Sequence, residues 1–589
     1  MLAIIPKRFL FLYLSSGRDN IEPMKKLRWP LLIAIIALAA ISILLISQKP
    51  DSLQPITVPE VQPAEGGIYS EGLVGTFMRL NPVLDFYNEA DRDVDRLLYS
   101  GMLRIDDRGL PQSELATSWG ISRDGMIYNF SLNPKAVWHD GQPVTSDDVI
   151  FTIQMMSSDD SPLPADIREF WKQIEIIRLD AKTVQFKLPE PFAPFLDYLT
   201  FGVLPSHLLG DLTLADMVND PFNLQPVGSG PYRFDHLITD EGKITGVVLS
   251  PFKDYYSQGA YIDQIALRYY PDASTAYAAY QAGDIAGIGN VTQDILAQVL
   301  TEKALNLYTT RLPAMTLILL NLDNPSAKFL QDANVRKALM QGLNRQGMID
   351  TLRSGQAILA DGPIFPGTWA YYDGIEHYSY NPNHSIDLLR EAGFTIPASG
   401  GDIRTSEEGT QLSFELIYPD DSEHTPLANA IQRDWASLGV QVNLTALTYD
   451  QLVSEHLDTR NYQAALVDLN LSRSPDPDPY PFWHQTQISS GQNYSMWDDR
   501  QASEYLEQAR ITTDLAERTR LYNNFQVRWS QELPALPLYY PVYTYAVSED
   551  VKGVSIGPIF DPADRFNHVT GWYLVTSHLT GEVTATPYP

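Results

Sequence analysis

Residues 411–471 constrain the fold most strongly, because the spacing of their apolar side chains changes from a two-residue period to a helical one and back. Within 412–444 the apolar residues alternate, then follow helical spacing, and alternate again after Gly439, which fits a helix C-cap. A further helix near 449–457 and an apolar strand at 462–471 complete a β-α-β-α-β pattern. This pattern predicts a parallel sheet covered on both faces.

An earlier part of the chain has an α+β pattern. Apolar alternation in 112–132 on both sides of Arg123-Asp124-Gly125 predicts a β-hairpin with an Asp-Gly turn. Thr145 and Asp148 have the spacing of a capping box at a helix N-terminus, and a short strand is expected near 183–188. The chain is therefore expected to contain at least two differently built lobes.

Composition narrows the function classes. The 589 residues are 44% hydrophobic and 11% aromatic, which is enough for large cores and three or four domains. With 42 Lys and Arg against 72 Asp and Glu, the formal charge is −30, which opposes binding to nucleic acid. The absence of cysteine excludes disulfides, thiolate metal sites, a cysteine nucleophile and a lipidated N-terminal cysteine.

The N-terminal region contains an apolar segment, residues 29–46, without a charged side chain. As a helix it would extend for about 27 Å, roughly the thickness of a bilayer hydrocarbon core. Basic residues concentrate in 1–28, so residues 1–28 are expected in the cytoplasm and the chain after the apolar segment is expected outside. No small-x-small cleavage site follows, which favours an uncleaved single-pass anchor in the cell membrane over a cleaved signal segment. Residues 47–66 are predicted to be a proline-rich linker.

A proline-rich loop is the best candidate site. In parallel sheets, ligands lie beyond the carboxyl ends of the strands, and the strand ending near Leu471 is followed at that edge by residues 472–483. Prolines stiffen this loop and fix the directions of two carboxylates and three aromatic side chains. The alternative is a surface loop whose aromatic residues pack on a neighbouring element.

Motifs for catalysis are missing. The sequence contains no G-x-S-x-G, H-E-x-x-H or G-x-x-x-x-G-K-[ST] motif, and no G-x-G-x-x-G follows a strand. Asp476 and Asp478 could form a glycosidase pair only if their carboxyl groups converged, whereas residues two apart in a rigid turn usually diverge. The ten histidines form no i, i+4 pair. We therefore predict no catalytic residues, no metal site and no cofactor, although distant histidines could serve a nickel or haem carrier.

Several landmarks follow one another along the chain: Asn81-Pro82 and the segments 97–132, 138–152, 226–234, 256–265, 282–285, 320–339, 380–394 and 517–540. Taken in this order, they resemble the motifs of the family 5 solute-binding proteins, the oligopeptide- and dipeptide-binding type that serves ABC importers. The resemblance covers about residues 67–556. Each motif is weak alone, but their order over this length is specific.

The resemblance implies an α/β fold with two hinged lobes, of the type II periplasmic-binding-protein kind, and the apolar segment 29–46 is expected to add one transmembrane helix before it. Lobe 1 would comprise 67–310, with an extra α+β subdomain at about 100–225, lobe 2 would comprise 311–538, and 539–589 would return to lobe 1 and form a tail. Within Pro226-Val-Gly-Ser-Gly-Pro-Tyr-Arg-Phe234, the resemblance implies an inter-lobe crossing. Gly228 and Gly230 would supply its hinge torsions. A tight turn between strands fits these residues equally well.

The function implied is capture of a peptide or similar solute in a cleft between the lobes and delivery to ABC permease subunits and their ATPases. The protein would be a monomer and not an enzyme, and its binding domain would be extracytoplasmic. Alternatives are an oligosaccharide or a metal chelate as the solute, or an anchored sensor or hydrolase.

In peptide-binding members of this family, an aspartate in the site loop pairs with the α-ammonium of the peptide. Alignment puts Arg473 or its neighbour Ser472 near that position, and an arginine would repel an ammonium and attract a carboxylate. Either Asp476 makes the pairing in a shifted loop, or the protein does not read a free N-terminus. The predicted ligand-binding residues are Arg473, Asp476, Asp478, Tyr480, Trp483, Asn493, Tyr494 and Trp497, the aromatic ones having packing as their alternative role.

Overall fold

The computed structural model describes Ala37 and residues 63–575, and the described residues from Pro63 onward belong to one compact unit. The predicted membrane segment, residues 29–46, lies outside the described residues except for Ala37. Within the described part of the chain, no helix combines the length and the apolar character needed to cross a membrane.

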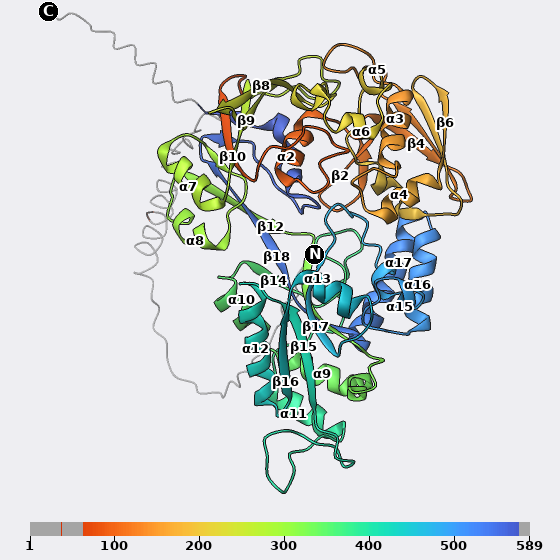
Figure 1. Cartoon of the computed structure of the whole chain (residues 1–589), viewed down its shortest axis with the longest axis vertical. Coiled ribbons are helices and arrows are strands. Elements are labelled where there is room, and N and C mark those ends of the chain that lie inside the picture. Colours follow the sequence, from red (N-terminus) through yellow and green to blue (C-terminus); the bar gives the residue numbers. More distant parts are fainter. Residues whose placement is uncertain (1–36, 38–62, 576–589) are drawn as a thin grey trace, which may run out of the picture. The chain divides into compact units, whose positions relative to one another are not determined.

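One twelve-stranded sheet organises the unit (Figure 1). Its order is β16-β15-β17-β13-β18-β11-β1-β10-β9-β8, and β12 and β14 also pair with β18. The strands are β1 (Ile68–Val74), β8 (Tyr232–Asp240), β9 (Lys243–Pro251), β10 (Gln264–Tyr270), β11 (Gly287–Ile288), β12 (Leu305–Arg311), β13 (Ala314–Leu320), β14 (Ala357–Leu359), β15 (Ser413–Pro419), β16 (Gln441–Leu447), β17 (Ala464–Asn470) and β18 (Ala535–Ser548).

The strands of this sheet belong to two parts of the molecule, each with its own large hydrophobic core. The buried residues of one core lie between Tyr69 and Leu267 and again between Tyr543 and Trp572. We call this part the first lobe. The buried residues of the other core all lie between Met315 and Tyr540, and we call this part the second lobe. The predicted two-lobed α/β architecture is therefore confirmed.

The long strand β18 belongs to both lobes (Figure 1). Its first half pairs with β13, and its second half pairs with β12 from Val542 onward. The chain itself passes from the first lobe to the second between β12 and β13, at Leu312-Pro313, where the Leu312 N–H donates to the carbonyl of Pro541 at 2.9 Å. Two adjacent strand segments therefore connect the lobes.

The second lobe contains the predicted β-α-β-α-β unit. β15 pairs in parallel with both β16 and β17, and Gly439 follows α12 with a φ of +83°. This left-handed conformation explains the glycine at the helix end. The helices of this lobe are η3 (Lys328–Gln331), α9 (Ala333–Gln341), α10 (Arg345–Leu352), α11 (Pro382–Glu391), α12 (His424–Ser437), α13 (Tyr449–Gln451), η4 (Leu452–Leu457), α14 (Tyr480–Trp483), α15 (Gln487–Ser490), α16 (Arg500–Ile511) and α17 (Leu515–Glu532).

An α+β subdomain extends the first lobe. Its sheet has the order β4-β5-β7-β6, and Gly125 at φ +71° turns the predicted hairpin. Thr145 and Asp148 form the predicted capping box of α3, and the other oxygen of Asp148 accepts from the N–H of Ser206, which ties α5 to α3. Its elements are β2 (Leu103–Ile105), β3 (Pro111–Ser113), β4 (Ala116–Ile121), β5 (Ile127–Leu132), α3 (Ser146–Met156), α4 (Ala165–Lys172), β6 (Glu175–Asp180), β7 (Thr183–Lys187), η1 (Ala193–Leu199), α5 (Ser206–Leu209), α6 (Leu214–Met217) and η2 (Pro221–Leu224).

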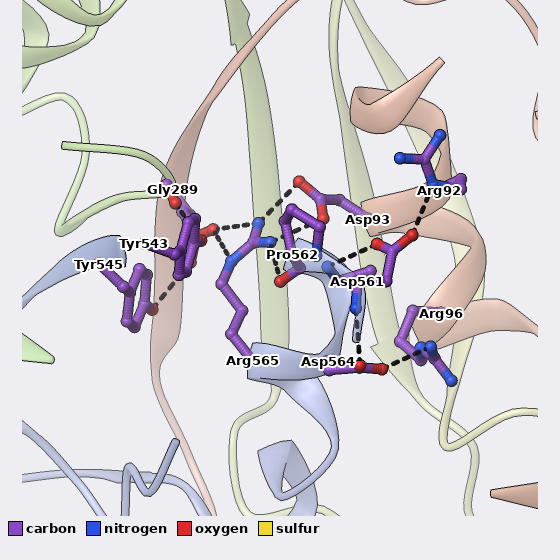
Figure 2. A network of polar contacts seen from close by, with 12 residues as sticks. Arg92, Asp93, Arg96, Gly289, Tyr543, Tyr545, Asp561, Pro562, Asp564 and Arg565 are labelled. Carbon is purple, nitrogen blue, oxygen red and sulfur yellow. Dashed lines mark hydrogen bonds and ion pairs between the residues drawn. The ribbon is translucent and has the colours of Figure 1, made fainter. Parts of the chain in front are cut away.

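The C-terminal segment returns to the first lobe and packs on helix α2 (Figure 2). Arg565, whose side chain is 1% exposed, lies 2.7 Å from Glu71 of β1 and 2.6 Å from Asp93 of α2. Arg92 and Arg96 of α2 pair with Asp561 and Asp564 of the returning segment. The remaining elements are α2 (Glu89–Leu98), α7 (Ala273–Ala282), α8 (Gln293–Val299), β19 (Val551–Lys552), η5 (Pro562–Phe566), η6 (Val569–Gly571) and β20 (Tyr573–Leu574).

Gly228 and Gly230 lie within the first lobe, away from the two connecting segments. The Gly230 N–H donates to the carbonyl of Leu98 at 2.8 Å, and a Cβ on Gly228 would lie 1.9 Å from that same oxygen. Close approach to the end of α2 thus requires glycine here. The expected inter-lobe crossing is instead made at Leu312-Pro313 and within β18.

Acidic side chains around α2 make the stability of the first lobe dependent on pH. Burial raises the pKa of Asp85, Asp91 and Glu114 to about 7 and that of Asp93 to about 6. A carboxyl group whose pKa is raised by folding does not lower the free energy of unfolding below its unfolded pKa, which is near 4. As the pH rises from there to its folded pKa, the group lowers the free energy of unfolding by an increasing amount.

We therefore expect the free energy of unfolding to fall between about pH 4 and pH 7, as measured by urea denaturation. The carboxyl groups with lowered pKa values act only below this window, because their unfolded pKa values are already near 4. Burial lowers the pKa of His139 to about 4, which raises stability across the same window, but the four carboxyl groups outweigh this one histidine. Glu114→Gln should make the decrease shallower, whereas Glu504→Gln, at an exposed pair with Arg500, should not. A free energy of unfolding that rises across this window would contradict the argument.

Candidate functional site

The loop that follows β17 contacts the first lobe. The Arg473 N–H donates to the carbonyl of Phe560 at 2.7 Å, and its guanidinium carbon lies 3.7 Å from the ring centroid of Phe86. Nearby, the Trp369 N–H of the second lobe donates to the carbonyl of Arg108 at 2.9 Å. The predicted site loop therefore lies where the two lobes meet.

The two aspartates of the loop are paired with arginines of their own lobe. Asp476, which is 8% exposed, lies 2.8 Å from Arg518 of α17. Asp478 accepts two charged hydrogen bonds from Arg510 of α16, from Nε at 3.0 Å and from Nη2 at 2.8 Å. Each carboxylate is thus paired with an arginine of the second lobe, and these two ion pairs attach the loop to α16 and α17.

A third carboxyl group reaches this cluster from the first lobe. Asp197 of η1 is buried close to Asp476, and both its burial and the charge of Asp476 raise its pKa well above the usual range. Arg518 is the nearby cation that opposes this rise. One arginine therefore faces two carboxyl groups from different lobes, which favours a proton on Asp197 when the lobes are in contact.

The aromatic and amide residues of the predicted site are mainly packed inside the second lobe. Trp483 is 2% exposed and lies edge-on to Trp529, and Trp497 is 5% exposed. Asn493 is fully buried and donates from its amide nitrogen to the carbonyls of His484 and Trp497. In the structure these three residues pack and form hydrogen bonds within the second lobe.

Tyr480 and Tyr494 are partly buried and also have internal partners. The ring of Tyr480 stacks on His484 at 4.0 Å, and Arg510 covers it at 4.1 Å. The hydroxyl of Tyr494 donates to Asp458 at 3.1 Å. Of the eight predicted residues, Arg473 stacks on Phe86 of the first lobe and Asp476 lies beside Asp197 of that lobe.

A second polar group lies at the carboxyl edge of β15, where sequence reasoning did not place a site. His424, at the start of α12, lies with Nδ1 2.8 Å from Asp421 and with Nε2 3.3 Å from Asp468 of β17. Burial lowers the pKa of His424, but the two carboxylates outweigh this effect, so its pKa is raised. Asp468 also accepts from Thr316 of β13 at 2.5 Å.

A sequence signal for this group exists. Asp420-Asp421 directly follows a predicted strand, at the sheet edge where ligands of parallel sheets bind. Both Asp421 and Asp468 have side chains that are more than 40% exposed, so the group can present carboxylates to a solute. Within the described residues, no three His, Asp or Glu side chains are arranged to hold a metal ion.

Comparison with known proteins decides the family. The model of the bacterial extracellular solute-binding proteins, family 5 (middle), matches residues 111–492. The chain belongs to the family 5 extracellular solute-binding proteins. This membership confirms the predicted class: a binding protein with an extracytoplasmic binding domain, and not an enzyme.

Relatives with different solutes share this family. The oligopeptide-binding protein AppA of Bacillus subtilis is 26% identical, over 87% of this chain and 92% of its own. Its structure with a nonapeptide superposes with a TM-score of 0.63 at 25% identity, covering 87% of this chain and all of AppA. The dipeptide-binding protein of Escherichia coli is 26% identical over 76% of this chain and 84% of its own. Heme-binding protein A of Haemophilus influenzae is 25% identical over 75% of this chain and 81% of its own.

Proposed function

We propose that this protein captures peptides in a cleft between its lobes and delivers them to the permease of an ABC importer. The observation that carries this proposal is that two lobes are joined by two adjacent strand segments and touch through the loop after β17. Relatives named as oligopeptide- and dipeptide-binding proteins support peptides as the solute.

The hinge is proposed at Leu312-Pro313 and at Pro541-Val542, where β18 exchanges β13 for β12 as its partner. The solute would shift an existing equilibrium between open and closed forms by binding the closed form more tightly. Moving a 1:99 mixture to 99:1 requires a preference of about 5.5 kcal/mol, which several buried hydrogen bonds and apolar contacts can supply.

Residues 29–46 are proposed to anchor the protein in the cell membrane, with 47–66 as its tether. The uncharged apolar sequence and the basic residues before it support this topology. In a carbonate extraction of membranes from cells that express the full chain, the protein should stay in the pellet. Its release into the supernatant would contradict anchorage.

Solute capture is tested with the full-length protein purified without added peptide. Denaturing mass spectrometry should release peptides that co-purified, and small-angle scattering should show a smaller radius of gyration when a peptide mixture is added to stripped protein. Recovery of only an oligosaccharide, haem or a metal chelate would refute peptide binding and retain the family function. Peptides returned as fragments would indicate a hydrolase instead.

A further inference from the structure

Arg311 lies at the junction of the two lobes. It is the last residue of β12, directly before the crossing at Leu312-Pro313, and it is 4% exposed. Its guanidinium carbon lies 4.5 Å from the ring centroid of Phe365 in the second lobe and 5.8 Å from that of Phe560 in the returning C-terminal segment. Parts of both lobes therefore cover one buried cation.

The hydrogen bonds of this guanidinium are incomplete. Nε donates to the carbonyl of Pro366 at 3.3 Å and Nη1 donates to that of Leu312 at 3.2 Å, whereas the buried Nη2 has no partner. No carboxylate of the described residues forms an ion pair with Arg311, although acidic residues outnumber basic ones by 72 to 42. An unpaired buried charge is costly, so its retention needs an explanation.

The other buried arginines of the described residues have either a carboxylate partner or carbonyl partners that leave no buried nitrogen unmatched. Arg518 and Arg565 each form ion pairs with carboxylates, and Arg345 pairs with Asp361. Arg404, which is 5% exposed and has no acidic partner, has its Nε and Nη1 bonded to carbonyls and leaves no buried nitrogen unmatched. Burial lowers the pKa of Arg311 to about 10, so it remains a cation at neutral pH.

A second arginine also contacts Phe560 of the returning C-terminal segment. Arg473 is bonded through its backbone to Phe560, and its guanidinium, held over Phe86, forms no ion pair with any carboxylate in residues 63–575. Asp85 and Asp561 act on it only through longer-range attraction, and burial raises the pKa of Asp85 to about 7, which weakens that attraction near neutral pH. Its φ of +64° is a left-handed conformation that a non-glycine residue rarely adopts.

We propose that Arg311 binds a carboxylate of the solute at the junction of the lobes, and that Arg473 adds a second positive charge which favours acidic solutes over those with a free ammonium at this end. This inference rests on the proposed function. When the lobes separate, Phe365 and Phe560 move apart and give an anion access to Nη2. A carboxylate that binds there completes the guanidinium fork and, on closure, supplies the missing counter-charge.

The test uses the full-length protein and four tetrapeptides of one backbone sequence, with a free or amidated C-terminus and with Glu or Gln at one internal position. These four peptides distinguish a terminal carboxylate from a side-chain carboxylate. By calorimetry, we expect the wild type to lose at least tenfold in affinity when the recognised carboxylate is removed. Arg311→Gln should bind the acidic peptide at least tenfold more weakly and the neutral one unchanged, and Arg311→Lys should be intermediate.

The solute-free proteins provide a matched control. Arg311→Gln should unfold at the same temperature as the wild type or higher, because it removes an unpaired buried charge. Arg404→Gln should unfold at a lower temperature, because it loses a hydrogen bond of 2.6 Å to Leu438 and relieves no unmatched nitrogen, whereas Arg311→Gln removes the unmatched Nη2 and loses only bonds of 3.3 and 3.2 Å. Arg404→Gln should also keep the ratio of acidic to neutral affinity. The comparison of acidic and neutral peptides on the wild type needs no variant, so a variant that fails to fold does not obscure the result.

Two results would overturn the inference. If all four peptides bind the wild type equally well, carboxylate recognition is refuted while peptide capture stands. If no peptide binds and the co-purified solute has no acidic group, or no solute is found, both the inference and the peptide function fail. An acidic solute of another kind, released at least tenfold more readily by Arg311→Gln, would refute peptides and support the anion site.

Discussion

Replacing Arg565 by alanine is expected to lower the free energy of unfolding by about 3–5 kcal/mol, because it leaves two buried carboxylates without their cation. The Glu71 carboxylate is fully buried, that of Asp93 nearly so, and both approach Arg565 within 2.7 Å. The hydroxyls of Tyr69 and Tyr545 also donate to Glu71, so the loss extends to a hydrogen-bonded group around β1. Denaturant unfolding monitored by tryptophan fluorescence measures the change.

Arg520→Ala is the matched control for this variant. Arg520 pairs with Glu517 at 2.7 Å, but both side chains are more than 40% exposed, so the expected loss is below about 1 kcal/mol. A loss below about 1 kcal/mol for Arg565→Ala as well would show that the returning segment does not depend on this ion pair. Faster proteolysis after residue 549 in Arg565→Ala alone would locate the defect in the C-terminal segment.

Replacing Asp476 by alanine is expected to lower the free energy of unfolding by about 3 kcal/mol or more, since it leaves Arg518 buried without its nearest carboxylate. Solute affinity should change much less than stability, because the partner of Asp476 in the structure is a helix arginine. The pKa of Asp197 should fall in this variant, because the negative charge beside it is removed. Urea denaturation and calorimetry with a bound peptide give the two quantities.

Asp478→Ala provides the comparison within the same loop. Its pair with Arg510 is more exposed, at 16% and 29% of the side chains, so the expected loss of stability is smaller than for Asp476. If Asp476→Ala keeps its stability and loses more than tenfold in affinity, the original expectation of a ligand contact is restored. An Arg518→Ala, Asp476→Ala double variant that is more stable than Asp476→Ala would confirm that the unpaired charge causes the loss.

Local signals in the sequence predicted much of the fold. The alternation around Arg123-Asp124-Gly125, the Thr145 cap and the change of period in 412–444 each depend on residues a few positions apart, and each element is present. The glycines of 226–234 were harder to interpret. The sequence shows that glycine is needed, but not whether for a hinge torsion or for contact with Leu98.

The candidate site depended on partners that no local pattern contains. Asp476 meets Arg518, which is 42 residues away, and Asp478 meets Arg510, which is 32 residues away, on helices whose position is set by packing. The position of the loop at the lobe junction could be expected, because ligands of parallel sheets lie beyond the carboxyl ends of the strands. The pairing of its carboxylates with arginines of the same lobe could not be expected from that rule. Arg311 has no motif at all, because its significance comes from the lack of an acid in three dimensions.

Strand β18 has a consequence for biosynthesis. Both lobes use it as an interior strand, yet it is the last strand of the twelve-stranded sheet in chain order. A nascent chain that ends at Glu532 lacks the strand on which β11, β12, β13 and β14 pair, so neither lobe can close its sheet before β18 has been made. The long-range contacts that finish the fold therefore form only after β18 has been made, and a polypeptide without them is expected to remain loose enough to be threaded through a secretion channel.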